Sequence, residues 1–230
     1  MAALAPTGRS QSLSTLGVVV TSVLAGLFCH LALKTSLLEG LLIGSVIGST
    51  DAASVFSILR SKKLNLKHNL ASLLEIESGS NDPTAYMMTM IFLSLMSAQK
   101  TGAFAWMILA QIGFGLLFGF GVALLSVWVL KRLSFENSGI QAIFVVAIAL
   151  AAYSIPAVLG GNGYLSVYIT GIVLGNSRIH QKVELVHFFD GLTWMMQIAL
   201  FFVIGLLSFP SQIPQVIVPS LLIALFLTFI

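Results

Sequence analysis

The sequence predicts an all-α polytopic membrane protein with about eight transmembrane helices. Of its 230 residues, 57% are hydrophobic and only 8% are charged, and the mean hydropathy is +1.01. A soluble domain of this size could not bury so much apolar surface. The apolar runs are continuous instead of alternating, which indicates helices and excludes a transmembrane barrel.

Eight stretches are apolar enough to form these helices, given that a membrane-crossing helix needs about 20 mostly apolar residues. The sixth is short, but glycine and asparagine residues mark both of its ends. The third is long, and its first half is polar. The stretches are residues 14–33, 37–59, 69–98, 103–130, 138–158, 163–176, 191–208 and 213–230.

Basic residues predict the orientation of these helices. If residues 1–13 form an N-terminal cytoplasmic segment, alternation leaves only Lys34 and Lys100 outside, which is the expected positive-inside bias. The net charge of +3 comes from scattered residues that form no extended patch, so no nucleic-acid partner is expected. Cys29 is the single cysteine, which excludes an internal disulfide. The predicted cytoplasmic residues are Arg9, Arg60, Lys62, Lys63, Lys67, Lys131, Arg132, Arg178 and Lys182.

Four carboxylates lie well inside the second and third stretches, in a chain with only eight acidic residues. They are Asp51, Glu75, Glu77 and Asp82. An ionisable side chain inside a membrane span costs about 2.5 to 3.5 kcal/mol on insertion scales, so such residues indicate a substrate or proton site. For Glu75, a polar segment preceding the membrane is an equal alternative. The pattern predicts a transporter and not an enzyme, and no cofactor is expected.

Small residues precede Asp51 in the second stretch. Gly44, Ser45, Gly48 and Ser49 would allow either close helix packing or local unwinding of a broken helix. Carbonyl groups freed by a broken helix coordinate cations in some transporters. Because Asp51 lies beside these residues, we favour the ion site over a packing face.

The third stretch places oxygen atoms on neighbouring helix faces. Ser78 and Asp82 are four residues apart on one face, and Glu77 and Asn81 form a second pair about 100° around the axis. Pro83 lacks an amide hydrogen, which leaves the carbonyl group of Gly79 less satisfied. Carboxylate, hydroxyl and carbonyl oxygens suit hard cations. The sequence therefore predicts a monovalent cation at Asp82, with further oxygens from Asp51, Thr50, Ser78 and the backbone.

These motifs resemble those of the monovalent cation:proton antiporter superfamily, in its NhaP-type branch. The resemblance rests on TD at residues 50–51 and ESGSNDP at 77–83. It continues through GNSRIH at 175–180 and HFFDGLTW at 187–194, which look like the bacterial potassium/proton antiporters of that branch.

The resemblance implies that Asp82 binds either a proton or a cation. Asn81 stands where electrogenic relatives have a second aspartate, which implies electroneutral, one-for-one exchange. The implied fold is an inverted repeat, with an ion-binding core bundle at 14–98, interface or scaffold helices at 103–208 and the start of a second core bundle at 213–230. The resemblance also implies potassium or sodium as the cation, membrane lipid and a homodimer or complementary chain as partners, and the bacterial inner membrane as location. Thr50, Asp51, Glu77 and Ser78 would complete the site, supported by Asn81, Pro83 and Gly79.

Two other interpretations compete with an active antiporter. Family members have about twelve or thirteen spans, so the chain is expected to be a fragment that is inactive alone or depends on a partner. The core arginine expected to balance Glu77 would then lie after Ile230. The second alternative is an intramembrane aspartyl enzyme, because Asp51 and Asp82 could share a proton, although no substrate-binding motif accompanies them.

Overall fold

The computed structural model describes residues 8–49, 70–97, 101–133 and 137–229, and side chains within 15–49, 81–97, 105–133 and 137–229. Every regular element in these ranges is helical. The helices are α1 (Gly8–Leu33), α2 (Leu37–Ile47), α4 (Leu70–Met96), α5 (Thr101–Arg132), α6 (Ser138–Val158), α7 (Gly163–Asn176), α8 (Lys182–Leu207), the 3₁₀ turn η2 (Pro210–Gln212) and α9 (Ile213–Phe229).

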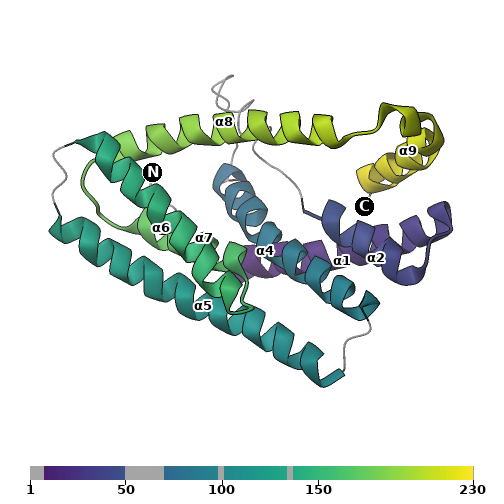
Figure 1. The fold of residues 1–230 in the computed structure, drawn as a ribbon, viewed down its shortest axis with the longest axis horizontal. Helices are drawn as coiled ribbons and strands as arrows, with labels where there is room; N and C mark the ends of the chain where they lie inside the picture. The colour runs from purple at the N-terminus through teal and green to yellow at the C-terminus, as the bar shows by residue number, and fades with distance from the viewer. Residues whose placement is uncertain (1–7, 50–69, 98–100, 134–136, 230) are drawn as a thin grey trace.

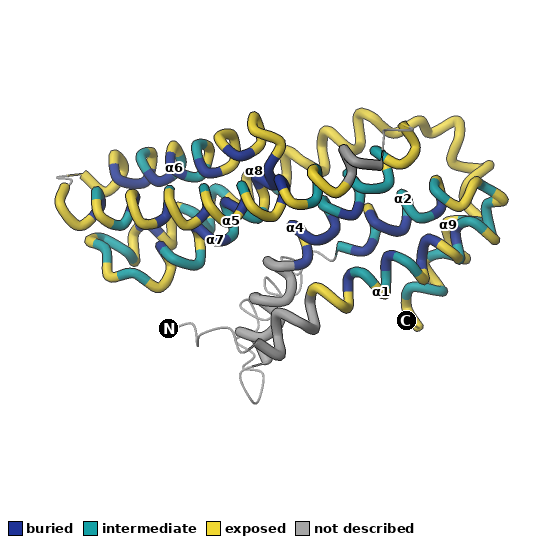
Figure 2. Tube along the Cα trace, turned by 90° about the horizontal axis from the view of Figure 1, so that it is seen from below, coloured by how far each residue is buried: buried dark blue, intermediate teal, exposed yellow. Residues whose placement is uncertain are grey.

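The helices form two groups that meet at α4 (Figure 1). In one group, α1 packs against α2, α4 and α9. In the other, α7 packs against α5 and α6. Helix α8 begins beside α6 and runs along the molecule toward α9. Figure 2 shows that buried positions gather inside each group, whereas α8 and α9 are mostly exposed.

Glycines allow α1 and α2 to pack closely. A Cβ atom on Gly40 would lie 2.6 Å from the carbonyl oxygen of Gly26, and one on Gly26 would lie 2.7 Å from Cα of Leu41. Real Cβ atoms essentially never approach so near, so only glycine fits at this crossing. Helix α2 begins with a capping box, in which Ser36 and Glu39 satisfy each other's backbone amides. The first group is therefore fixed by backbone contact and capping.

Apolar side chains from four helices form the core of the second group. Leu130 of α5, Val145 and Ile148 of α6, Leu174 of α7 and Leu185 of α8 belong to one buried cluster. Their burial explains why α8 starts where it does. The contact through Leu185 requires helix before the predicted start at residue 191, and α8 indeed begins at Lys182.

The predicted spans agree closely with the helices except at three places. Helix α1 begins at Gly8, within the predicted N-terminal segment 1–13, although its apolar part, 15–33, lies close to the predicted span 14–33. The predicted seventh span, 191–208, is too short at its start, because α8 already begins at Lys182. The predicted second span, 37–59, is helical only as far as Ile47 among the described residues, and residues 50–59 lie outside the description. Five helical stretches are long and apolar enough to cross a membrane in the described part of the chain: 15–33, 105–132, 138–158, 182–207 and 210–229.

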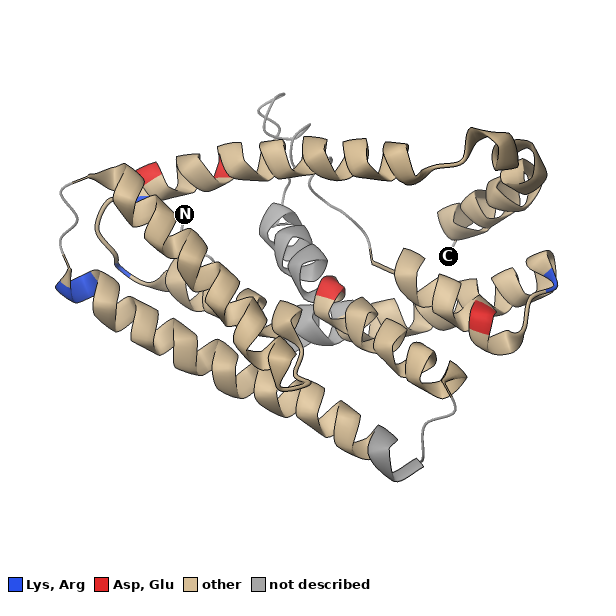
Figure 3. Cartoon of the chain, viewed as in Figure 1, with Lys and Arg blue, Asp and Glu red and all other residues tan. Residues whose placement is uncertain are grey.

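Charged residues lie mostly near helix ends (Figure 3). Basic residues lie at the end of α5 and between α7 and α8 at one end of the molecule, and between α1 and α2 at the other. This arrangement agrees with the predicted orientation, in which Lys131, Arg132, Arg178 and Lys182 are cytoplasmic and Lys34 is not.

Candidate functional site where α2 ends beside α4

Helix α4 is continuous through Pro83, which is itself buried. The two residues before Pro83 differ in environment: Asn81 is fully buried, whereas Asp82 is exposed. Successive helix residues lie about 100° apart, so one faces the helix packing and the other the surface of the described chain.

Ser49 joins the end of α2 to this point of α4. Its hydroxyl group donates a hydrogen bond to Oδ1 of Asp82 and lies 3.3 Å from Oδ1 of Asn81. One hydroxyl group has only one hydrogen to donate, so the two acceptors share it. One turn earlier on α2, the Ser45 hydroxyl lies 3.0 Å from that of Thr89. Polar contacts thus continue along the α2–α4 interface.

Asn162 holds α4 from the other side. Its Nδ2 atom donates to the carbonyl oxygen of Pro83 at 3.0 Å, and its Oδ1 atom accepts from the amide of Leu165 at 3.0 Å, which caps α7. Its own amide donates to the carbonyl oxygen of Gln111 on α5 at 3.1 Å. Asn162 is 2% exposed. It therefore connects the residue after Asp82 to α5 and α7.

The role of Asn162 was not predicted from the sequence. The Gly-Gly-Asn-Gly turn at 160–163 marked only the start of the predicted sixth span. The available signal was an amide side chain placed between glycines in an apolar region, where a buried polar group needs a hydrogen-bond partner. Gly163 supports the same turn, because a Cβ atom there would lie 2.6 Å from the carbonyl oxygen of Tyr153.

The other predicted site residues are only partly placed. Thr50 and Asp51 lie outside the described residues, so their position relative to Asp82 is untested. Glu77, Ser78 and Gly79 lie in α4 in the turn before Asp82, but their side chains are outside the description. The helical spacing assumed for the pairs 78/82 and 77/81 is present in α4. Helix α2 ends after Ile47, which agrees with the interpretation of this stretch as a broken helix. The glycine contacts between α2 and α1 show that the stretch also forms a packing face.

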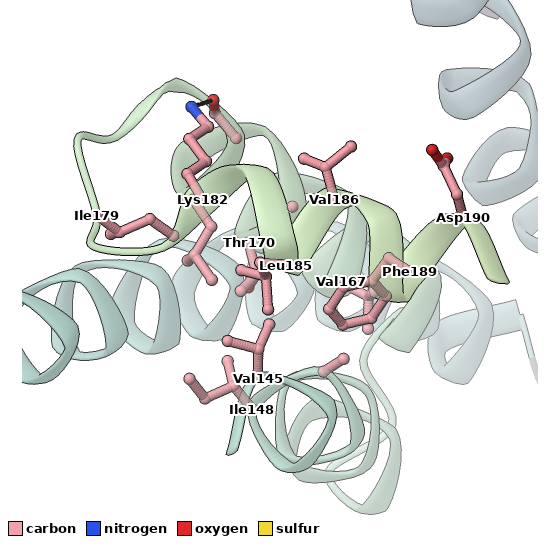
Figure 4. A pocket seen from close by; sticks show the side chains of 14 residues that line it. Val145, Ile148, Val167, Thr170, Ile179, Lys182, Leu185, Val186, Phe189 and Asp190 are labelled. Atoms are coloured by element: carbon pink, nitrogen blue, oxygen red, sulfur yellow. Dashed lines mark hydrogen bonds between the residues drawn. The ribbon is translucent and has the colours of Figure 1, made fainter. Parts of the chain in front are cut away.

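A cavity of about 350 Å³ lies between α6, α7 and α8 (Figure 4), and Asp82 is not among the residues that line it. Its lining is mostly apolar. Two of its polar side chains are bonded to the protein: Thr170 donates toward the carbonyl oxygens of Ser166 and Gly119, and the Lys182 ammonium donates to those of Gly175 and Ser177. Asp190 also lines the cavity, but none of the predicted site residues does, so the cavity is separate from the candidate ion site.

The fold and the site together define the class of membrane protein to which the chain belongs. The protein is a multi-pass helical membrane protein in which a carboxylate on α4 meets a hydroxyl group at the end of a short helix. The sequence profile of the family "Sodium/hydrogen exchanger, transmembrane" matches residues 7–230. The chain belongs to this family, as the sequence motifs predicted.

Relatives and a solved structure agree with this assignment. The chain is 39% identical over 232 residues to the K(+)/H(+) antiporter NhaP of Alkalimonas amylolytica, covering 99% of this chain and 39% of that protein. It is 36% identical over 217 residues to the K(+)/H(+) antiporter NhaP2 of Shewanella baltica, and the match covers 93% of this chain and 37% of that protein. The chain therefore spans less than half the length of these relatives.

The fold is similar to that of the sodium proton antiporter MjNhaP1 from Methanocaldococcus jannaschii. The TM-score is 0.81 at 20% sequence identity, and the match covers 98% of this chain and 57% of that one. The helical antiporter fold predicted from the sequence is thereby confirmed.

Proposed function

We propose that this chain forms the ion-binding part of a secondary transporter that exchanges potassium or sodium for protons, in a bacterial inner membrane. The contact between Ser49 and Asp82 carries the proposal. It places a carboxylate and a hydroxyl group where a short helix ends, and such ends offer unpaired carbonyl groups to cations. The names of the relatives above support potassium as one candidate cation and protons as its counterpart.

The proposed mechanism is competition for one negative charge. A proton or a cation neutralises Asp82, and each excludes the other because both need the same carboxylate oxygens. Asn81 carries no charge, so the pair offers one charge per cycle, which supports one-for-one exchange. Thr50, Asp51, Glu77 and Ser78 would complete or support the site, as the family resemblance implies.

The exposure of Asp82 supports a second candidate function, a membrane fragment that is inactive alone or requires a complementary chain. A transport site must be shielded from at least one side of the membrane, and the described helices leave Asp82 open. Because the chain covers 39% of the Alkalimonas relative, we propose that further helices of such a protein, or a second chain, cover this face. In that arrangement, residues 14–98 form the core bundle and 103–208 the scaffold, and 213–230 begin a second bundle.

A proton-flux assay tests the leading proposal. Everted vesicles from an antiporter-deficient bacterium would carry the chain or its Asp82→Asn variant, and a dye would report loss of the proton gradient when KCl or NaCl is added. We expect cation-dependent loss with the original chain and none with Asp82→Asn, which keeps a hydrogen-bond acceptor for Ser49 but removes the charge. Glu184→Gln on α8 is the matched control and should leave exchange unchanged.

Each result has a defined meaning. Exchange that persists in Asp82→Asn contradicts the assignment of this carboxylate. Absence of exchange in the original chain, with normal amounts in the membrane, favours the second function. Co-expression with the remaining region of a relative should then restore the cation response.

A further inference from the structure

Ser22 of α1 has a buried hydroxyl group without a hydrogen-bond partner among the described residues. It is 0% exposed, and its Oγ atom is one of few buried side-chain oxygens left unpaired. Some helical serines in this chain bond a carbonyl group of their own helix: Ser154 of α6 bonds that of Leu150 at 2.7 Å, and Ser45 of α2 bonds that of Leu42 at 2.8 Å. A buried hydroxyl group without this bond is energetically unfavourable, so its position calls for an explanation.

The Ser22 hydroxyl group lies against the end of α2. The nearest atom to a Cβ built on Gly48 is Oγ of Ser22, closer than real Cβ atoms approach, and Cβ of Ser22 lies 3.3 Å from the same point. Gly48 is the C-cap of α2, and the next residue, Ser49, donates to Asp82. Ser22 therefore borders the same helix end as the carboxylate site, although it belongs to a different helix.

A helix end of this kind is a source of oxygen ligands. The last four carbonyl groups of a helix have no partner within it and form the negative end of the helix dipole. Gly48 provides the space that Oγ of Ser22 occupies. The absence of a side chain there lets a hydroxyl from α1 approach the backbone of α2. Ser22 can accept a cation contact because both of its oxygen lone pairs are unused.

We propose that Ser22 is a ligand of the exchanged cation, contributing a neutral hydroxyl oxygen beside the last carbonyl groups of α2. The ligand class is a partly dehydrated monovalent cation, potassium or sodium. The inference rests on the proposed function and adds α1 to a site otherwise made by α2 and α4. It also accounts for the buried, unpaired hydroxyl group of Ser22.

Cation-dependent thermal stability of the purified chain tests the inference without requiring transport. Unfolding would be followed in detergent while choline chloride is replaced by KCl or NaCl at constant ionic strength. Loss of one hydroxyl contact should raise the half-saturating cation concentration about fivefold in Ser22→Ala. Stability in choline chloride should be unchanged or higher, because the variant removes an unpaired polar group.

Ser166→Ala is the matched control. Ser166 is also 0% exposed with an unpaired hydroxyl group, but it lies on α7, and its substitution should leave the half-saturating concentration unchanged. Ser22→Gly should repeat the effect of Ser22→Ala if the lost oxygen is the cause. An unchanged half-saturating concentration in both Ser22 variants would overturn the inference.

The variant Asp82→Asn distinguishes a failure of the inference about Ser22 from a failure of the proposed function. If the original chain responds to the cation and Asp82→Asn does not, the carboxylate site stands, and only the Ser22 variants decide the role of α1. If the original chain gives the same stability in choline, potassium and sodium, the proposed function fails, and the inference that rests on it fails too.

Discussion

Asn162 connects three helices and is buried. Its replacement should therefore lower the free energy of unfolding by a measurable amount, which can be separated into two contributions. Asn162→Ala removes both the cap of α7 and the hydrogen bond to Pro83. Loss of an N-cap costs about 1 kcal/mol, and an interhelical hydrogen bond in a membrane protein contributes about 0.6 to 1.7 kcal/mol. We therefore expect the free energy of unfolding to fall by about 1.6 to 2.7 kcal/mol.

A second variant separates the two contributions. Asn162→Ser keeps an oxygen that can cap α7 but is too short to reach the carbonyl group of Pro83. Its expected cost is about 0.6 to 1.7 kcal/mol, which is the interhelical bond alone. The assay is reversible unfolding by SDS in mixed micelles, followed by far-ultraviolet circular dichroism.

The control is Ser154→Ala, which removes an exposed hydroxyl group bonded only to its own helix and should change stability by less than about 0.5 kcal/mol. Two results would refute the reasoning. One is an Asn162→Ala variant as stable as the original chain. The other is an Asn162→Ser variant as unstable as Asn162→Ala, which would mean that the cap contributes nothing separable.

Two further substitutions test the packing of each group by the same unfolding assay. Gly44→Ala places a Cβ atom 2.7 Å from Cα of Gly26 and should destabilise the chain by about 1 to 3 kcal/mol. The control is Gly121→Ala, which has no neighbouring atom within 4 Å of the added Cβ and should be neutral or slightly stabilising. Equal effects of the two substitutions on stability would contradict close α1–α2 packing. Lys182→Met removes the ammonium group that bonds the carbonyl oxygens at the end of α7. It should lower the free energy of unfolding by about 0.3 to 1 kcal/mol. An unchanged free energy of unfolding at low ionic strength would exclude a stabilising role for this group.

The sequence predicted the helices best where polar residues mark their ends. The predicted sixth span, 163–176, coincides with α7, because Asn162 caps one end and Asn176 and Ser177 follow the last apolar turn. The predicted seventh span, 191–208, starts later than α8, whose first turn contains the charged residues Lys182 and Glu184. Charged residues in a first helical turn are compatible with a helix whose apolar side chains pack on a neighbour, as Leu185 does. Hydropathy alone cannot distinguish these cases.

For the site, the sequence predicted Asp82, Asn81 and Pro83 through their motif, and the structure places them where α2 ends. It could not predict Ser22 or Asn162 as neighbours of this site. Asn162 contacts a residue 79 positions away, and Ser22 contacts α2 only because glycines permit a close crossing. Such contacts depend on the relative position of helices, which no local pattern encodes. The exposure of Asp82 depends equally on which helices cover α4.

The two groups of helices hold α4 at consecutive residues. Ser49 of the first group bonds Asp82, and Asn162 of the second bonds the carbonyl group of Pro83. Because one peptide unit separates these contacts, the position of the carboxylate depends on the scaffold as well as on α2. Asn162→Ser should therefore reduce cation-dependent stabilisation even though it leaves every oxygen of the proposed site in place. Unchanged cation dependence in that variant would show that α1 and α2 alone position Asp82.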